Sequence, residues 1–320
     1  MINDKDNNGE KIQLISKDTS AYREMPYKYR LFNFYYRVLR NKTIGMPLLS
    51  IFIIFEMIEL ISYAFIEEYR KLWKIKDKSF DLVQLITGST RITILTKYLT
   101  FNQYLIIYLI LVGFIFISFL LIAMTLTFNR TDSKLYSICV VFTSYVTSNC
   151  CIFFLIPISE VMLLMVKCND KNEVDIIKES IKCFEGLHFI YIFVALLMMV
   201  CFLIIIVLNA IFNFNPFNAN KPTCIINPSA NTFLVIFKIV LVILYIASEN
   251  DWINIVIMLL GSLLNSKNSI ENPTYNSFFL QCLVSIRNFS VFWTFFFLVL
   301  CKLFYSSKFD GMISIFFKRR

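Results

Sequence analysis

Residues 104–128 read YLIIYLILVGFIFISFLLIAMTLTF, a continuous apolar run without a charged side chain. An α-helix needs roughly 20 predominantly apolar residues to cross a bilayer, so this run predicts a membrane-spanning helix. Working outward from it, comparable apolar runs occupy residues 44–66, 187–212, 232–247 and 278–305. A chain with this pattern is expected to lie in a membrane as a set of packed helices.

The number of spans depends on two irregular runs. Residues 135–166 are too long for one upright helix at about 1.5 Å per residue, and Pro157 is expected to kink that helix because its ring lacks a donor and clashes with the preceding turn. Residues 252–264 are too short for a span and are expected to be interfacial or re-entrant. The sequence therefore predicts an all-α, polytopic transmembrane helical bundle of about six spans, with seven as the alternative.

Composition supports the same class of protein. Hydrophobic residues make up 58% of the 320 residues, charged residues 17%, and the mean hydropathy is +0.66, whereas soluble domains average about 25% charged residues. We expect a polar, basic and aromatic tail over 1–43, a transmembrane helical domain over 44–305 and a basic tail over 306–320. The protein is thus predicted to be an integral multi-pass membrane protein, in a membrane that the sequence does not specify.

Two segments outside the spans have the pattern of interfacial helices. Residues 30–40, RLFNFYYRVLR, alternate aromatic and basic side chains and suit a helix lying against lipid headgroups, with a disordered tail as the alternative. Between the first two spans, apolar residues recur at intervals of three to four, as in an amphipathic helix: Phe80, Val83 and Ile86, and then Ile92, Leu95 and Leu99.

The formal net charge of +9 indicates which partners to expect. The basic residues lie mainly in the tails and the longer loops, where they would meet anionic headgroups. The lipid bilayer is therefore the expected partner, other membrane subunits are further candidates, and nucleic acid is not expected. Lysine and arginine are equally numerous on the two sides of a six-span model, so the charge rule gives no orientation. A cytoplasmic N-terminus is expected only because no export signal is recognisable there.

Five charged side chains interrupt the apolar runs, and these are the candidate functional residues. Each would cost at least about 2.5–3.5 kcal/mol if left alone in hydrocarbon. They form a candidate intramembrane charge network: Glu56, Glu59, Glu160, Lys238 and Arg287. Three interpretations are open: a cation or proton pathway beside Pro157, ion pairs that only neutralise charge and fix helix register, or side chains that reach toward the span ends.

Signatures of other functions are missing from the sequence. No phosphate-binding glycine loop, selectivity filter or voltage-sensing arginine repeat occurs, and His188 is the only histidine. We therefore expect no enzyme activity, no catalytic residues, no cofactor and no metal site. Cys168 and Cys183 could pair in an oxidising compartment, but two free thiols are the favoured expectation.

Several segments resemble a known family. The stretches FEMIELISYAF, FLIPISEVMLLMVKC and ENPTYN, within residues 50–276, resemble the N-terminal membrane region of a large protist, chiefly ciliate, family of multi-span membrane proteins. Members of that family join several spans to a long cytoplasmic part with PAS-type sensor domains or TPR-like repeats. This chain ends at FFKRR without such a part, so it is expected to be either a membrane-only relative or a fragment of a longer protein.

These observations lead to two functional hypotheses. The first is a membrane anchor or input module of a signalling-type protein, without catalysis of its own. The alternative is an ion channel or carrier that uses the buried carboxylates. The charge-network residues are where the two hypotheses differ.

Overall fold

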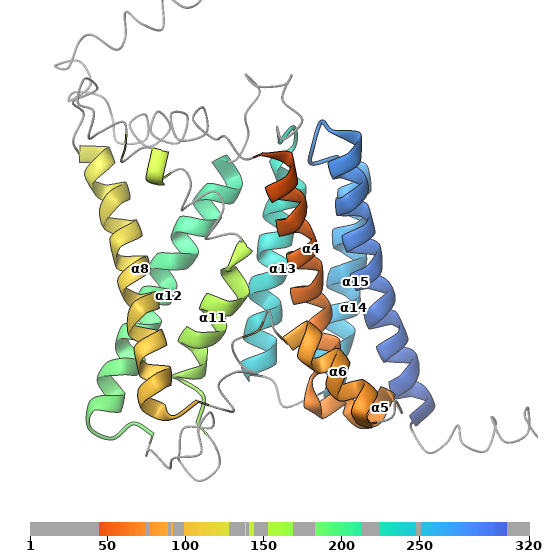
Figure 1. The fold of residues 1–320 in the computed structure, drawn as a ribbon, viewed down its shortest axis with the longest axis horizontal. Coiled ribbons are helices and arrows are strands. Elements are labelled where there is room, and N and C mark those ends of the chain that lie inside the picture. The colour runs from red at the N-terminus through yellow and green to blue at the C-terminus, as the bar shows by residue number, and fades with distance from the viewer. Residues whose placement is uncertain are drawn as a thin grey trace, which may run out of the picture.

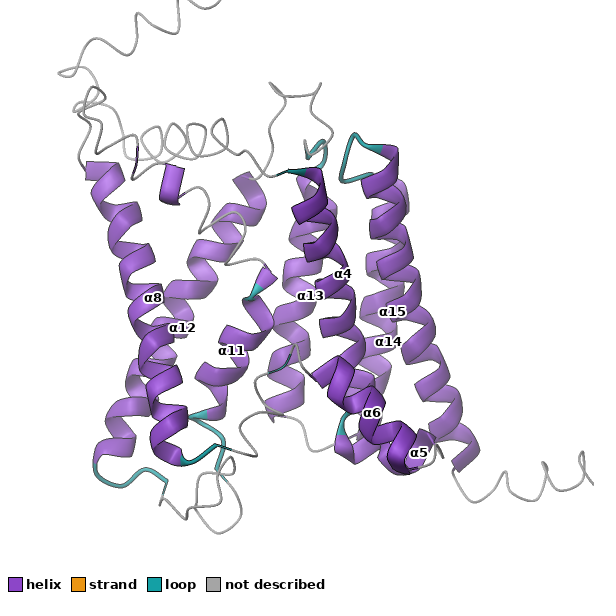
Figure 2. Cartoon of the chain, viewed as in Figure 1, coloured by secondary structure: helices purple, strands orange, loops and turns teal. Residues whose placement is uncertain are grey.

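The computed structural model describes residues 45–73, 77–88, 91, 99–127, 138, 141–143, 153–168, 183–212, 225–247 and 251–305, which are almost entirely helical and contain no strand (Figures 1 and 2). The elements in chain order are α4 (Met46–Ser62), η1 (Tyr63–Phe65), η2 (Glu67–Tyr69), α5 (Arg70–Trp73), α6 (Asp77–Gly88), α8 (Phe101–Thr127), α11 (Leu155–Leu164), α12 (Leu187–Phe212), α13 (Pro228–Ala247), α14 (Asp251–Glu271) and α15 (Phe278–Tyr305).

Six of the described helices are long and apolar enough to cross a membrane, namely α4 with η1, α8, α12, α13, α14 and α15. The prediction of an all-α polytopic bundle is therefore confirmed, and the chain is a multi-pass membrane protein. Large apolar side chains cover its outer surface, as on α8, where Ile106 and Ile110 are 58% and 64% exposed. Such a surface is suited to contact with lipid tails rather than water.

Helix α14 shows that the expectation for residues 252–264 was wrong. The helix does not stop at Leu264 but continues through NSKNSIE to Glu271, giving a full-length helix between α13 and α15. Several of its polar residues lie on the buried face, where Ser262, Asn265 and Ser269 recur at intervals of three to four. The described residues contain six full-length apolar helices, with α14 among them, whereas the run 135–166, which the sequence counts as a span, contributes the shorter helix α11.

Helix α11 is the described part of the long run 135–166. It begins at Leu155, after a turn at Phe154, so that Pro157 lies in its first turn rather than at a kink within it. Backbone N–H groups of a first turn have no partner within the helix, so the donor that proline lacks costs nothing there. Nine of its ten residues are buried, because α11 packs against α8, α12 and α13.

The helices alternate in direction across the bundle. Figure 1 shows α4, α11, α13 and α15 running one way and α8, α12 and α14 running the other, so that α4 begins at one end and α15 finishes at the opposite end. Contacts between connections support this order: Ile225 before α13 pairs with Tyr275 after α14, and Lys302 near the end of α15 lies 2.8 Å from Asp251 at the start of α14. The direction of α11 therefore supports the seven-crossing alternative.

Local sequence explains where α13 begins and how closely it approaches α14. The Asn227 side chain accepts a hydrogen bond from the Ser229 backbone N–H at 3.0 Å, and Pro228 occupies the first position of the helix, a common N-terminal combination. Gly261 of α14 packs against Phe237 of α13, whose ring carbon would lie 2.3 Å from a Cβ at that position. Only glycine fits this approach without displacing the ring.

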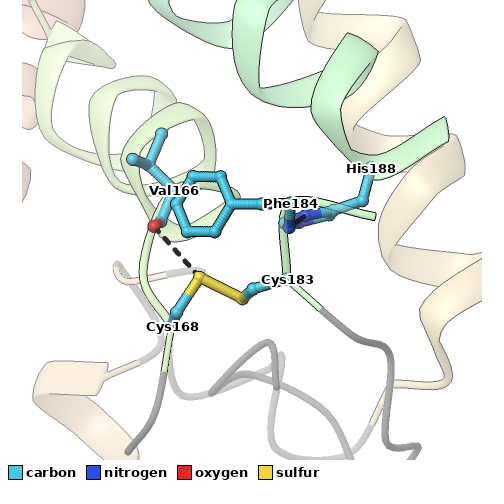
Figure 3. The surroundings of a disulfide bond; sticks show 5 residues. All are labelled: Val166, Cys168, Cys183, Phe184 and His188. Carbon is cyan, nitrogen blue, oxygen red and sulfur yellow. Dashed lines mark hydrogen bonds between the residues drawn. A yellow bond between two sulfur atoms is a disulfide. The ribbon is translucent and has the colours of Figure 1, made fainter. Parts of the chain in front are cut away.

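Cys168 and Cys183 form a disulfide, which corrects the expectation of two free thiols. The bond joins the segment after α11 to the turn before α12, as Figure 3 shows. Because α11 and α12 pack side by side, the two Cα atoms lie 6.2 Å apart, within the usual range for a disulfide. Spacing along the sequence alone could not show that these helices are neighbours.

Of the two segments predicted to form interfacial helices, the structure describes part of the one between the first two spans. Helix α6 covers the first part of the expected amphipathic segment, with Phe80 buried against the bundle and Leu82 and Leu85 exposed, and residues 92–98 of that segment lie outside the described residues. The expected helix at 30–40 and the two predicted tails, 1–43 and 306–320, lie outside the described residues.

Candidate functional site

Four of the five predicted charged residues meet in one place, which we call the helix-borne network: Glu56, Glu59, Lys238 and Arg287. The Lys238 ammonium of α13 lies 2.6 Å from Oε1 of Glu56 and 3.4 Å from Oε2 of Glu59 on α4. The Arg287 guanidinium of α15 donates to Oε2 of Glu56. The network therefore joins three helices through two carboxylates and two cations.

The positions of these residues follow from helix geometry. Glu56 and Glu59 are three residues apart and so lie on the same face of α4. All four side chains are buried, with Lys238 and Glu59 at 0% exposure, so none of them reaches open solvent. Charges buried in this way are tolerated when they are paired, and these charges balance.

Polar side chains extend the network into α14. Nε of Arg287 donates to Oδ1 of Asn288 at 3.0 Å, and the same oxygen accepts a bond from Nδ2 of Asn265 at 2.9 Å. The Ser266 hydroxyl donates to the backbone carbonyl of Asn288 at 3.2 Å. This explains why the second half of α14, which is polar in sequence, remains inside the bundle.

The fifth predicted residue, Glu160, belongs to a separate group, the Arg91–Glu160 cluster, which consists of Arg91, Glu160, Tyr63 and Tyr245. Nε and Nη2 of Arg91 lie 2.9 Å and 2.7 Å from the same oxygen, Oε1 of Glu160. The Tyr63 hydroxyl also donates to that oxygen, at 2.8 Å. Glu160 is thus neutralised by a residue that does not belong to any of the spanning helices.

Two aromatic rings enclose the Arg91 guanidinium. Its Cζ lies 4.2 Å from the ring centre of Tyr63 and 4.3 Å from that of Tyr245, both distances suited to cation–π attraction. Although burial opposes the charge, the Glu160 carboxylate raises the pKa of Arg91 above its ordinary value. Arg91 therefore remains a cation inside the bundle, at 1% exposure.

Two carboxylate oxygens in these groups have neither a hydrogen-bond partner nor an ion-pair partner among the described residues. They are Oε1 of Glu59 and Oε2 of Glu160, and both residues are fully buried. A buried oxygen without a partner is costly, so each marks a carboxylate whose hydrogen bonding is incomplete although its charge is paired.

The Arg91–Glu160 cluster was not found from the sequence. Arg91 lies outside the apolar runs, and Tyr63 and Tyr245 carry no charge, so none of the three is among the predicted residues. One signal did point to it: the apolar runs contain three acidic residues but only two basic ones, so a third cation was required to balance Glu160. Its position in the chain could not be derived from that count.

Neither a candidate metal site among the described residues nor a similar known protein indicates a function for the two groups. Within the part of the chain that the structure describes, no group of three His, Cys, Asp or Glu side chains could hold a metal ion. No protein-family model, curated protein or solved structure matches the chain. A function must therefore be argued from the two charged groups and the membrane-spanning fold.

Proposed function

We propose that this chain is a membrane anchor or input module of a signalling-type protein, with no catalysis of its own. The observation that supports it is the pairing of every charge in the two groups: Glu56 and Glu59 with Lys238 and Arg287, and Glu160 with Arg91. Paired charges hold neighbouring helices in register, whereas a pathway for ions needs carboxylates that are free to exchange them.

The sequence resemblance gives this module a context. In the protist family that the chain resembles, the membrane region precedes a cytoplasmic part with PAS-type or TPR-like domains, which is the origin of the signalling element in the proposal. Under it, the partners are the surrounding lipids and other membrane subunits, with no role for nucleic acid.

A second candidate is an ion channel or carrier that uses the buried carboxylates. The two oxygens without partners, on Glu59 and Glu160, favour it, because a proton or cation moving through the bundle would need acceptors of this kind. Tyr63 connects the two positions, since it follows Glu59 by four residues on the same helical path and donates to Glu160.

Flux measurements distinguish the two functions. The purified protein is reconstituted into liposomes, and proton and potassium fluxes are compared with those of protein-free liposomes. We expect no difference for the wild type. A flux above background that falls in both Glu59→Gln and Glu160→Gln would contradict the anchor proposal and support the carrier.

The matched control is Glu271→Gln. Glu271 is an acidic residue on the exposed side of α14, with a side chain 59% exposed and paired only with Lys267. Its substitution removes the same charge without touching either buried group. A flux lost equally in this variant would indicate a general effect of charge or reconstitution.

A further inference from the structure

The Arg91–Glu160 cluster has the composition of a binding site for an organic cation. One carboxylate, one tyrosine hydroxyl and the faces of two tyrosine rings surround a single guanidinium, at the distances given above. Tyr63 and Tyr245 are also in contact with each other, with ring centres 5.6 Å apart in an edge-on arrangement. Combined carboxylate and aromatic surfaces are a recurrent means of recognising guanidinium and ammonium groups.

Arg91, the cation of the cluster, lies on a connection, whereas Glu160, Tyr63 and Tyr245 lie on helices. Tyr63 and Tyr245 belong to η1 and α13, and Glu160 belongs to α11, so the walls of the site are built from the bundle itself. Arg91 lies on the connection between α6 and α8, where its backbone N–H bonds to the carbonyl of Gly88. Its side chain can leave the cluster without the unfolding of a spanning helix.

Arg91 contacts only one of the two oxygens of the Glu160 carboxylate. Both of its contacting nitrogens lie against Oε1 of Glu160, and Oε2 has no partner among the described residues although the side chain is fully buried. A guanidinium that is not tethered to a backbone can rotate so that its parallel N–H groups reach both oxygens, which is the favoured bidentate geometry. The site is therefore better matched to a free guanidinium than to the one it contains.

The cluster lies close to an end of the bundle. Tyr63 directly follows the last residue of α4, and Tyr245 precedes the last residue of α13 by two positions. Tyr245 is only partly buried, unlike Tyr63. A ligand from the adjacent aqueous phase would have a short distance to travel, whereas Lys238 of the helix-borne network lies midway along α13.

We infer that Glu160, Tyr63 and Tyr245 form a binding site for small guanidinium compounds, in which Arg91 is the bound ligand in this structure and competes with a free one. The planar guanidinium stacks between the rings and pairs with the carboxylate, which a metal cation or a compact ammonium does less well. The inference goes beyond the anchor or input role and does not depend on it, because a conducting bundle could contain the same site.

Binding of methylguanidinium to the full chain in nanodiscs tests the inference, with methylammonium as the competing chemistry. We expect Arg91→Ala to bind methylguanidinium at least about tenfold more tightly than the wild type, which must first release its own side chain. Methylammonium should bind more weakly than methylguanidinium. The double variant Arg91→Ala, Glu160→Gln should lose binding, because the carboxylate is gone.

Specific outcomes would overturn the inference. These are no binding of methylguanidinium to Arg91→Ala, equal affinities for the wild type and Arg91→Ala, equal binding of the two probes, or binding retained in the double variant. If Arg91→Ala does not fold, Arg91→Gln removes the charge while keeping part of the side-chain volume, and the same four comparisons apply. Flux is not the readout, so failure here is distinguishable from failure of the proposed function.

Discussion

The helix-borne network and the Arg91–Glu160 cluster both pair buried carboxylates with cations, but the cations are carried by different parts of the chain. In the first, Glu56, Lys238 and Arg287 are all fixed on spanning helices, and none can leave without disturbing α4, α13 or α15. In the second, the carboxylate is fixed on α11, but its cation comes from a connection. The comparison teaches that buried charge pairs in one bundle need not share a role: the first joins three spanning helices, and the second is the one for which we infer an exchangeable cation.

The largest expected effect comes from breaking the helix-borne network at Glu56. Glu56→Gln leaves Lys238 and Arg287 in the membrane interior with only Glu59 to balance them. We expect a loss of about 3–5 kcal/mol in the free energy of unfolding, the usual cost of removing one partner of a buried pair. Chemical unfolding in nanodiscs, followed by the fluorescence of the three tryptophans, measures it.

Glu59→Gln is the matched comparison for this variant. Glu59 has the same burial and lies one turn away, but its only ion pair is the 3.4 Å contact with Lys238. Its loss should cost less than that of Glu56. Equal losses for the two variants would show that the bundle responds to total charge rather than to the particular pairs.

The second effect concerns the attachment of α11, which carries Glu160. Cys168→Ser removes the disulfide that closes a segment of 15 residues, and loop-closure entropy predicts a loss of about 3 kcal/mol. Unfolding with and without reductant should reproduce this difference in the wild type. Cys201→Ser, at a free and partly buried thiol, is the control and should not change the response to reductant.

A third variant tests the packing that places Lys238. Gly261→Ala introduces a Cβ against the ring of Phe237, the residue next to Lys238, and we expect it to destabilise the protein by about 1–3 kcal/mol through overpacking. Gly113→Ala on α8 is the control, since nothing lies within 4 Å of a Cβ there. Because alanine favours the helix more than glycine does, Gly113→Ala should be neutral or slightly stabilising, and a similar loss in both variants would contradict the role of the α13–α14 contact.

The smallest effect is expected at the Arg91–Glu160 cluster. In Glu160→Gln, Arg91 can withdraw toward water, so the loss should be about 1 kcal/mol, close to that of a hydrogen bond. The same unfolding measurement checks it. A loss as large as that of Glu56→Gln would show that Arg91 cannot leave, and would remove the distinction between the two groups.

The parts of this architecture that the sequence predicted are those that depend on apolar length alone. Runs such as 104–128 identify spanning helices directly, because lipid requires a continuous apolar surface. The sequence does not predict α14 as a full-length spanning helix, because hydropathy alone does not show that polar residues such as Asn265 form hydrogen bonds with α15.

The candidate site was predictable to a similar extent. Charges within the spans identified Glu56, Glu59, Lys238, Arg287 and Glu160 as candidates, because isolated charges are rare in hydrocarbon. Which charge pairs with which depends on helix neighbours and on the path of the connection that carries Arg91, and neither can be derived from spacing. The roles of these residues as a conduction pathway or a binding site remain predictions for experiment.

The opposite placement of the start of α4 and the end of α15 has a consequence for how this chain divides two compartments. Gly45, directly before α4, and Tyr305, the last residue of α15, lie at opposite ends of the bundle, and α15 finishes at the end where α11 ends and α12 begins, with the Cys168–Cys183 bond between them (Figure 1). Disulfides persist in oxidising surroundings and are rare in the cytosol. The structure predicts that the disulfide and the end of α15 face the same compartment, opposite to the start of α4.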